Sequence, residues 1–348
     1  MSQRPRIYLD HAATTPILPA AKAAMNEAME RWANPSSPHA EGRAARAALE
    51  DARARIKKAL GWDGDLIFTS GASEAIEIAL RGRPAAQLAI SAVEHDAVHR
   101  VARGADLLSV STDGLIDLSQ ALPATAVIQF ANNETGVVQP WEDIAPLREQ
   151  GHVFLADAAQ SAGKLRLPKA DMVAVSAHKL GGPPGVGALL VRSAASLKAI
   201  GGQEKGYRPG TQNLPGILGF AAALEAREDW MDRAASLRER LEARLVAAGA
   251  EVVAAGAPRI PTIGAYRMAG VPSETQLIHF DLAGIAVSAG SACSSGSMKA
   301  SHVLAAMGWD ETAAREVIRV SFGPQTTAWD VDACADAWEA LAQRRSAA

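Results

Sequence analysis

The chain has 348 residues, 48% of them hydrophobic, and a formal net charge of -3. At about 100–200 residues per domain, this length predicts two domains, and the small net charge gives no reason to expect nucleic acid or an anionic membrane as a partner. The sequence has no apolar leader and no apolar run approaching about 18 residues, so we expect no signal peptide, no membrane span and a cytoplasmic protein.

Short apolar runs alternate with helical patterns over the first part of the chain. The runs are DLIFTS, QLAISA, TAVIQFAN, HVFLAD, DMVAVS and GVGALLVR, and helical spacing follows each of the first three. Short, nearly continuous apolar strands separated by helices are typical of a parallel sheet covered on both faces. The sequence therefore predicts an α/β fold.

The pattern changes after the long amphipathic segment WMDRAASLRERLEARLVAAGAE. Shorter elements follow, namely VVAAG, PTIGAYRM, TQLIHFDLAG, EVIRVSFG and a last helix. This change indicates a second, smaller α+β domain that starts near the helix around Trp230.

Chemically capable side chains stand at the ends of two predicted strands, where α/β sheets bind ligands. DMVAVS leads to Ser176, His178 and Lys179, and a desolvated lysine of this kind bonds covalently with carbonyls. Asp157 ends HVFLAD and has the charge to hold a pyridinium nitrogen protonated, as pyridoxal phosphate requires. Taken singly, a surface lysine before a turn and an aspartate helix cap explain these residues equally well.

A third strand end has the features of a phosphate site. In FTSGASEA a strand breaks at Gly71 and a helix begins at Ala72 and Ser73, so backbone N–H groups, a hydroxyl and the helix dipole are available to an anion. Simple capping is again the alternative for this motif alone. A lysine, an aspartate and a phosphate site on separate strand ends together favour one cofactor site.

Other candidates are more ambiguous. His95 follows a strand and suits ring stacking or proton transfer, but also a polar helix start. Asn133, next to Asn132 in a turn-like segment, is suited to a substrate carboxylate. Arg319, inside the apolar strand VIRVSFG, needs an anionic partner, and a substrate carboxylate and a structural Asp or Glu fit it equally. The histidines show no metal-ligand spacing.

Cys293 lies in SAGSACSSG, where its small neighbours cannot bury it. Two cysteines, the other being Cys334 in a helical pattern, do not make a disulfide framework. An exposed thiol is a liability unless it is used, so Cys293 is a candidate nucleophile.

Taken together, these motifs resemble the cysteine desulfurases, pyridoxal phosphate enzymes of the class V aminotransferase group. The motifs, in the family's order, are YLDHAATTP, NPSSPHAEG, FTSGASEA, EHDAV, NNETGVVQP, DAAQSAGK, SAHKLGGPPGVG, RPGTQN, SAGSACSSG and IRVSFG. The resemblance runs from about Tyr8 to about Gly323. It implies a fold type I transferase with a mainly parallel seven-stranded sheet, a large domain over residues 15–231, and a small domain from residues 1–14 and 232–348.

The resemblance also implies a role for each matching residue. Lys179 would hold pyridoxal 5'-phosphate covalently, Asp157 its ring nitrogen and Gln160 its ring hydroxyl, with His95 stacked on the ring. The phosphate would be bound by Ala72, Ser73, Ser176 and His178, and by Thr211 from the other subunit of a homodimer. Asn133 and Arg319 would bind the substrate carboxylate, and Cys293 would attack the substrate sulfur.

The implied reaction converts L-cysteine to L-alanine and leaves a persulfide on Cys293. The sulfur would pass to an acceptor protein for iron–sulfur cluster or thio-cofactor biosynthesis. Alternatives are a selenocysteine lyase or another class V aminotransferase, for which the thiol is dispensable, and a non-catalytic scaffold protein. The scaffold reading predicts a damaged lysine site, and the sequence shows no such damage.

Overall fold

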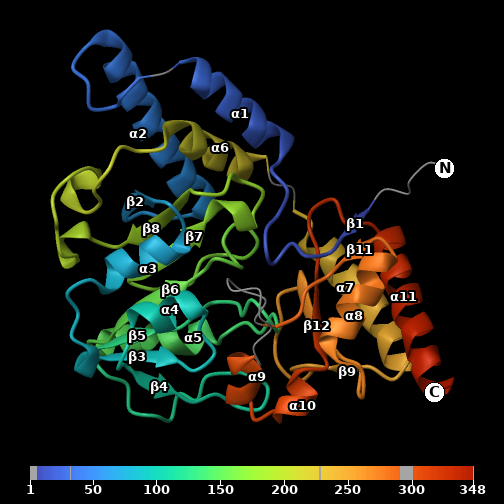
Figure 1. The fold of residues 1–348 in the computed structure, drawn as a ribbon. Helices are drawn as coiled ribbons and strands as arrows, with labels where there is room; N and C mark the ends of the chain where they lie inside the picture. Colours follow the sequence, from blue (N-terminus) through green and yellow to red (C-terminus); the bar gives the residue numbers. More distant parts are fainter. Residues whose placement is uncertain (1–5, 32, 227–228, 291–300, 348) are drawn as a thin grey trace.

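The computed structural model describes residues 6–31, 33–226, 229–290 and 301–347 and places them in two adjacent lobes (Figure 1). Within these residues, the large lobe contains a seven-stranded sheet of order β2-β8-β7-β6-β5-β3-β4. β8 is antiparallel to β2 and β7, and the other neighbouring pairs are parallel. The strands are β2 (Asp65–Thr69), β3 (Leu88–Ser91), β4 (Asp106–Leu108), β5 (Thr125–Val127), β6 (Val153–Asp157), β7 (Met172–Ser176) and β8 (Gly187–Val191). The predicted mainly parallel seven-stranded sheet is confirmed.

Helices cover both faces of this sheet (Figure 1). The α-helices of the large lobe are α1 (Pro19–Glu30), α2 (Ala40–Leu60), α3 (Ala72–Leu80), α4 (Asp96–Val101), α5 (Trp141–Ile144) and α6 (Leu214–Glu225). Short 3-10 turns are η1 (Ala85–Gln87), η2 (Ala145–Gln150), η3 (Ala177–Lys179), η4 (Ala194–Ser196) and η5 (Glu204–Gly206). The helical spacing predicted after TAVIQFAN lies in EDIAPLREQG, and the structure divides this segment between α5 and η2.

The sequence of α2 shows how these helices are defined. The His39 ring accepts a hydrogen bond from the Gly42 N–H at the start of the helix. Gly61 ends the helix with φ of 65°, the left-handed conformation that glycine adopts readily. Leu49, Ile56 and other apolar residues at helical spacing form its buried stripe.

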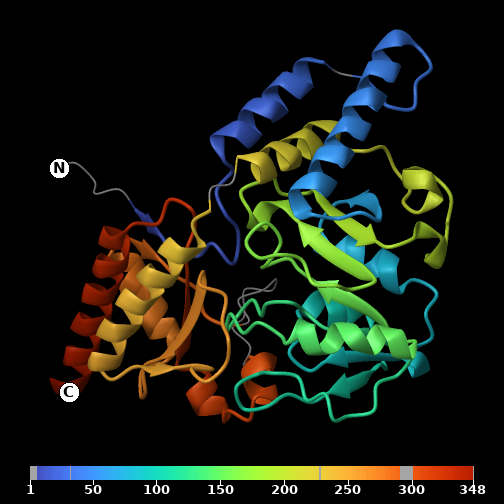
Figure 2. The same ribbon diagram turned by 180° about the vertical axis from the view of Figure 1, so that it is seen from behind.

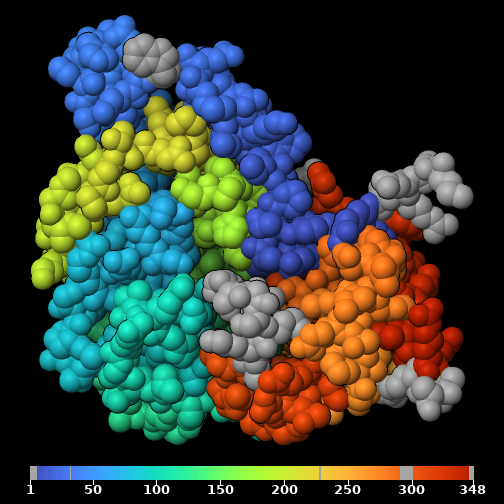
Figure 3. Space-filling model, viewed as in Figure 1, coloured from blue at the N-terminus to red at the C-terminus, as the bar shows by residue number. Residues whose placement is uncertain are grey.

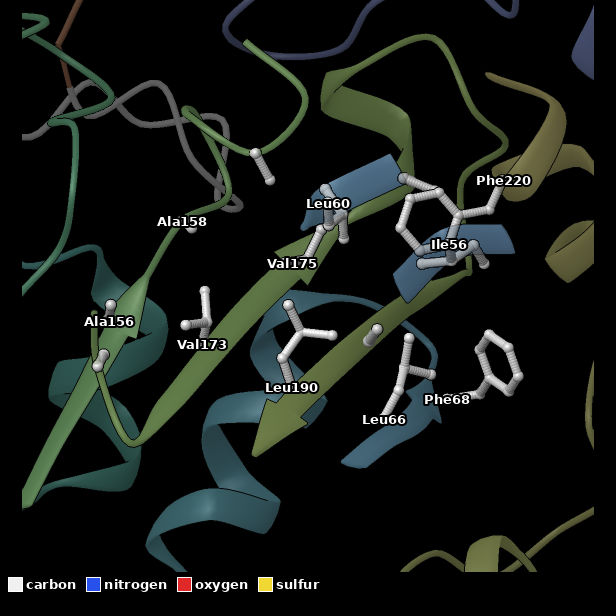
Figure 4. Close-up of a cluster of buried hydrophobic side chains, with 14 of the residues drawn as sticks. Ile56, Leu60, Leu66, Phe68, Ala156, Ala158, Val173, Val175, Leu190 and Phe220 are labelled. Carbon is white, nitrogen blue, oxygen red and sulfur yellow. The ribbon is translucent and has the colours of Figure 1, made fainter. Parts of the chain in front are cut away.

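Alternation along β7 explains why its strand is apolar throughout. Val173 and Val175 point into the core that α2 and α6 cover, together with Leu190 and Phe220 (Figure 4). Met172 and Ala174 point into the opposite core, which α3 covers. Because side chains alternate between the two faces, a sheet covered on both sides needs apolar residues at every strand position.

The small lobe has its own hydrophobic core. Its strands are β1 (Ile7–Tyr8), β9 (Glu251–Val252), β10 (Ile263–Arg267), β11 (Ile285–Ala286) and β12 (Val317–Ser321). The remaining helices are α7 (Met231–Ala247), α8 (Ser273–Leu282), α9 (His302–Ala306), α10 (Glu311–Ala314) and α11 (Ala328–Ala347). β12, β10 and β9 form an antiparallel sheet, β1 pairs with β11, and α7 packs against α11 (Figure 2). The division of the chain at residues 14 and 232 remains a proposal.

The segment after β1 joins the two lobes. Space-filling Figure 3 shows this N-terminal segment between the large lobe and the small lobe. Its Ala12 N–H donates to the Ser321 hydroxyl of the small lobe, and its Thr15 N–H donates to the His178 carbonyl of the large lobe, both over 2.9 Å. The segment is thereby fixed beside the carboxyl ends of β6 and β7. No helix in the described parts of the chain is long and apolar enough to cross a membrane.

Candidate active site

A cavity of about 540 Å³ lies at the carboxyl ends of the large-lobe strands, beside the small lobe. Ten of the twelve site residues predicted from the sequence line it. They are Ala72, Ser73, His95, Asn133, Asp157, Gln160, Ser176, His178, Lys179 and Arg319. The nine large-lobe residues stand at or after strand ends or at helix starts, where α/β sheets bind ligands, and Arg319 reaches the cavity from within β12 of the small lobe.

The other two predicted residues are not among the described residues that line the cavity. Thr211 is exposed on the loop that leads into α6. Cys293 lies outside the described residues, between Gly290, which lines the cavity, and Ser301, which caps α9. The Ser301 hydroxyl in turn donates to the buried carboxylate of Glu134 over 2.5 Å.

The start of α3 forms a backbone cradle at one end of the cavity. Gly71 adopts φ of 156° and ψ of -179°, a conformation that residues with side chains avoid, and this turns the chain sharply from β2 into α3. A Cβ on Gly187 would lie 2.6 Å from the Gly71 Cα, so glycine is required there for close approach. The N–H groups of the first turn of α3 therefore face a space beside Ser176 and His178, as an anion site requires.

Lys179, in the turn after β7, is held by the N-terminal segment. Its Nζ donates to the carbonyls of Ala12 and Ala13 over 2.6 and 2.7 Å. Burial and, to a smaller extent, the charge of neighbouring Lys179 together lower the pKa of His178 to about 4. His178 is therefore neutral at pH 7 and can donate a hydrogen bond to an anion without a charge of its own.

Asp157 is buried and His95 is half-buried, and burial shifts the pKa values of the two groups in opposite directions. Burial at the end of β6 raises the pKa of Asp157. The hydrogen bond from the Ala159 N–H and the positive charges of His95 and Lys179 oppose that rise. Burial lowers the pKa of His95, against the opposing charge of Asp157. The His95 Nδ1 accepts from the Ala97 N–H over 3.1 Å, which places the imidazole proton on Nε2.

Gln160 and Arg319 each keep one buried polar atom unpaired among the described residues. The Gln160 amide nitrogen donates to the Ala12 carbonyl over 2.9 Å, whereas its Oε1 has no partner there. Arg319 donates from Nη1 to the Asn133 carbonyl and from Nη2 to Asp10, but its Nε has no partner. Such atoms are costly when buried, so both point to a ligand.

Asp10 is the site residue that sequence reasoning missed. It lines the cavity and pairs with Arg319, so the structural carboxylate partner considered for this arginine does exist. A lone aspartate directly after the apolar residues IYL was the only local signal. Asn132, by contrast, has a structural role, because its side chain bonds to the Val93 carbonyl and to the backbone of its own turn.

Cys334 is the cysteine that lies within the described residues. Cys334 is buried in α11, and this burial raises the pKa of its thiol to about 12. It is therefore a poor source of thiolate at neutral pH. Among the described residues, no group of three or more His, Cys, Asp or Glu side chains is arranged to hold a metal ion.

Comparison with known proteins agrees with this fold. The class V aminotransferase family model matches residues 7–334. The cysteine desulfurase of Gluconacetobacter diazotrophicus is 38% identical over 95% of this chain and 92% of its own, and that of Cereibacter sphaeroides is 38% identical over 94% and 93%. The NifS-like protein from Rickettsia africae superposes with a TM-score of 0.89 at 32% identity, over 97% of this chain and 99% of that one.

The chain belongs to the class V aminotransferase family. Relatives of 34–38% identity are named cysteine desulfurases, so the family resemblance predicted from the sequence is confirmed.

Proposed function

We propose that this protein is a pyridoxal 5'-phosphate-dependent cysteine desulfurase that converts L-cysteine to L-alanine and retains the sulfur as a persulfide on Cys293. The observation that carries the proposal is the single cavity in which Lys179, Asp157 and Arg319 meet from three separate strands. A class V aminotransferase without sulfur chemistry needs the first two residues equally, so Cys293 distinguishes the activity.

The cavity residues fit the cofactor. The α3 cradle, Ser176 and neutral His178 suit a phosphate, and an ionised Asp157 suits a protonated ring nitrogen. The unpaired Oε1 of Gln160 would gain a partner from the ring hydroxyl. Lys179 is the residue that would hold the cofactor covalently. When bound, the cofactor supplies withdrawal of electrons from the substrate Cα.

The side chains of this protein then bind the amino acid and move its proton. The Nε group of Arg319, which has no partner among the described residues, and the Asn133 side chain would donate hydrogen bonds to the substrate carboxylate. Neutral His95 or the amine of Lys179 would take the Cα proton, because each carries a lone pair when unprotonated. The fixed position of Arg319 determines which face of the amino acid turns toward these bases.

Cys293 would complete the sulfur chemistry. Its thiolate attacks the substrate sulfur and an S–S bond forms. The C–S bond breaks with its electron pair left on the substrate Cβ, which takes up a proton to become the methyl group of alanine. Cys293 is three positions beyond Gly290, a span of at most about 11 Å, so its distance along the chain allows it to reach the cavity. Cys334, whose thiol pKa is raised to about 12, cannot substitute for it.

The same proposal includes the partners. Thr211, exposed on its loop, would complete the phosphate site of a second copy, which makes the protein a homodimer. A cytoplasmic sulfur-acceptor protein would take the persulfide sulfur for iron–sulfur cluster or thio-cofactor biosynthesis.

The activity is tested with purified protein and three substrates. Incubation with L-cysteine and a reductant should release alanine and sulfide in equal amounts. Selenide release from L-selenocysteine with no turnover of L-cysteine would favour a selenocysteine lyase, and amino transfer from an amino acid to a 2-oxo acid without sulfide release would favour an aminotransferase. No turnover of any substrate by cofactor-loaded protein would contradict the proposal.

A further inference from the structure

A second cavity, of about 320 Å³, shares Lys179 with the active-site cavity but is otherwise lined by different residues. Its walls come from the start of α1, the turn after β6, the end of α6 and the small lobe. They are Thr15, Leu18, Pro19, Ala20, Gly163, Lys164, Lys179, Leu180, Ala223, Leu224, Ala226, Trp230, Pro324 and Gln325. The desulfurase proposal assigns no function to this space.

The walls of this cavity are mainly apolar. Leu224 and Trp230 are 1% and 7% exposed, and Leu18 and Leu180 complete the hydrocarbon surface. Small-molecule sites commonly measure about 300–1,000 Å³ and combine apolar walls with a few polar groups. A small, largely apolar molecule therefore fits the size and surface of the cavity.

One charged group, Lys164, distinguishes the cavity from a packing defect. Burial and, to a smaller extent, the charge of Lys179 together lower the pKa of its ammonium group to about 7. The positive charge of Lys164 also helps to keep His11 neutral, with a pKa lowered to about 4. Lys164 is half-buried, and no carboxylate among the described residues forms an ion pair with it, so its charge is available to an anionic ligand in the cavity.

We propose that this cavity binds a small apolar carboxylate, such as an aromatic ring on a short aliphatic acid. The carboxylate pairs with Lys164, and the hydrocarbon part lies among Leu18, Leu224 and Trp230. The ligand contacts both lobes, because Trp230 packs in the small-lobe core while Leu224 packs in the large-lobe core.

The test is calorimetric titration of the cofactor-loaded protein, without substrate, with 3-phenylpropanoate and with its neutral analogue 3-phenylpropanol. Wild type should bind the acid saturably and at least about tenfold more tightly than the alcohol, since a charge-assisted hydrogen bond contributes this much. Lys164→Met keeps an apolar stem and should remove the preference for the acid. Lys169→Met, at an exposed lysine, is the matched control and should leave it unchanged.

The active site also offers a carboxylate partner, Arg319, so the two sites are separated by variants. Acid binding that persists in Arg319→Gln and weakens in Lys164→Met supports the second cavity. Acid binding that is lost in Arg319→Gln and retained in Lys164→Met would overturn the proposal. If Lys164→Met does not fold, equal wild-type affinity for acid and alcohol, or no binding of either, would also overturn it.

Discussion

Arg319 and Asp10 form a largely buried ion pair in the cavity that Lys179 also lines, with Nη2 of the arginine 2.8 Å from Oδ1 of the aspartate. A second bond from Nη1 to the Asn133 carbonyl, 2.9 Å long, fixes the guanidinium plane. The Nε group remains buried without a partner among the described residues, and an unsatisfied buried donor costs about 1–3 kcal/mol. A substrate carboxylate that accepts from Nε would relieve this cost.

We therefore expect Arg319→Lys to raise the KM for L-cysteine at least about tenfold, because an ammonium group cannot contact Asp10, Asn133 and a carboxylate in one plane. Steady-state kinetics with L-cysteine measures the effect. Arg315→Lys is the matched control, since Arg315 is exposed and pairs with Glu311 on its own helix end. An unchanged KM in Arg319→Lys would assign this arginine a purely structural role.

The lowered pKa of His95 sets the expected pH dependence. Burial favours the neutral imidazole, so the form that accepts a proton is present above pH 6.5 and is lost only as pH falls through the lowered pKa. We expect kcat/KM to stay level from pH 7 down to pH 6.5 and to fall at more acidic pH. His95→Gln should be slow at every pH and lack that acidic decline. A decline that persists unchanged in His95→Gln would belong to another group.

Glu204 supports the loop that carries Thr211. Its carboxylate is 1% exposed and accepts from Arg53, the Phe68 N–H and the Gln212 amide. Burial alone would raise the pKa of Glu204, but Arg53, with the Gln212 amide and the Phe68 N–H, outweighs burial and lowers this pKa overall. The ionised carboxylate therefore stabilises the fold above about pH 4.5, its unfolded value. This contribution is lost as pH falls through the lowered folded pKa.

Glu204→Gln should therefore lower the free energy of unfolding at pH 7 by about 3–5 kcal/mol, the usual cost of removing one member of a buried pair. Chemical denaturation measures it, and Glu239→Gln, at an exposed position, should change little. The difference between wild type and Glu204→Gln should shrink under acidic conditions. A difference that does not depend on pH would contradict the assigned ion pair.

Lys179 should determine the colour of the protein. A lysine that holds the cofactor covalently gives the purified protein a yellow absorption band, so Lys179→Ala should lose the band and the activity. Lys164→Met, at a neighbouring lysine outside the active-site cavity, should keep the band. An identical spectrum for wild type and Lys179→Ala would contradict the assignment of Lys179.

The sequence predicted the strands whose periodicity is strong and the residues at their ends. β6 and β7 are apolar throughout because both faces are buried, and Asp157 and Lys179 were found where those strands stop. β4 was missed because an edge strand of three residues, with Leu107 61% exposed, has no burial pattern to reveal it.

Contacts between distant segments explain the rest of what was missed. Asp10 and Arg319 are 309 positions apart, and the preference of Arg319 for a structural or a substrate carboxylate could not be decided from either segment alone. The cavity beside Lys164 was not predicted either, because its walls come from both lobes. Packing of this kind has no local sequence signal.

The most direct test of the account compares the two cysteines in one assay. Wild type, Cys293→Ala and Cys334→Ala are each incubated with L-cysteine and a reductant, and alanine and sulfide are measured together. We expect equal amounts of both products from wild type and from Cys334→Ala, because the Cys334 thiol of the wild type is buried in α11. We expect almost no product from Cys293→Ala. Full activity in Cys293→Ala would contradict the proposal that Cys293 carries the sulfur.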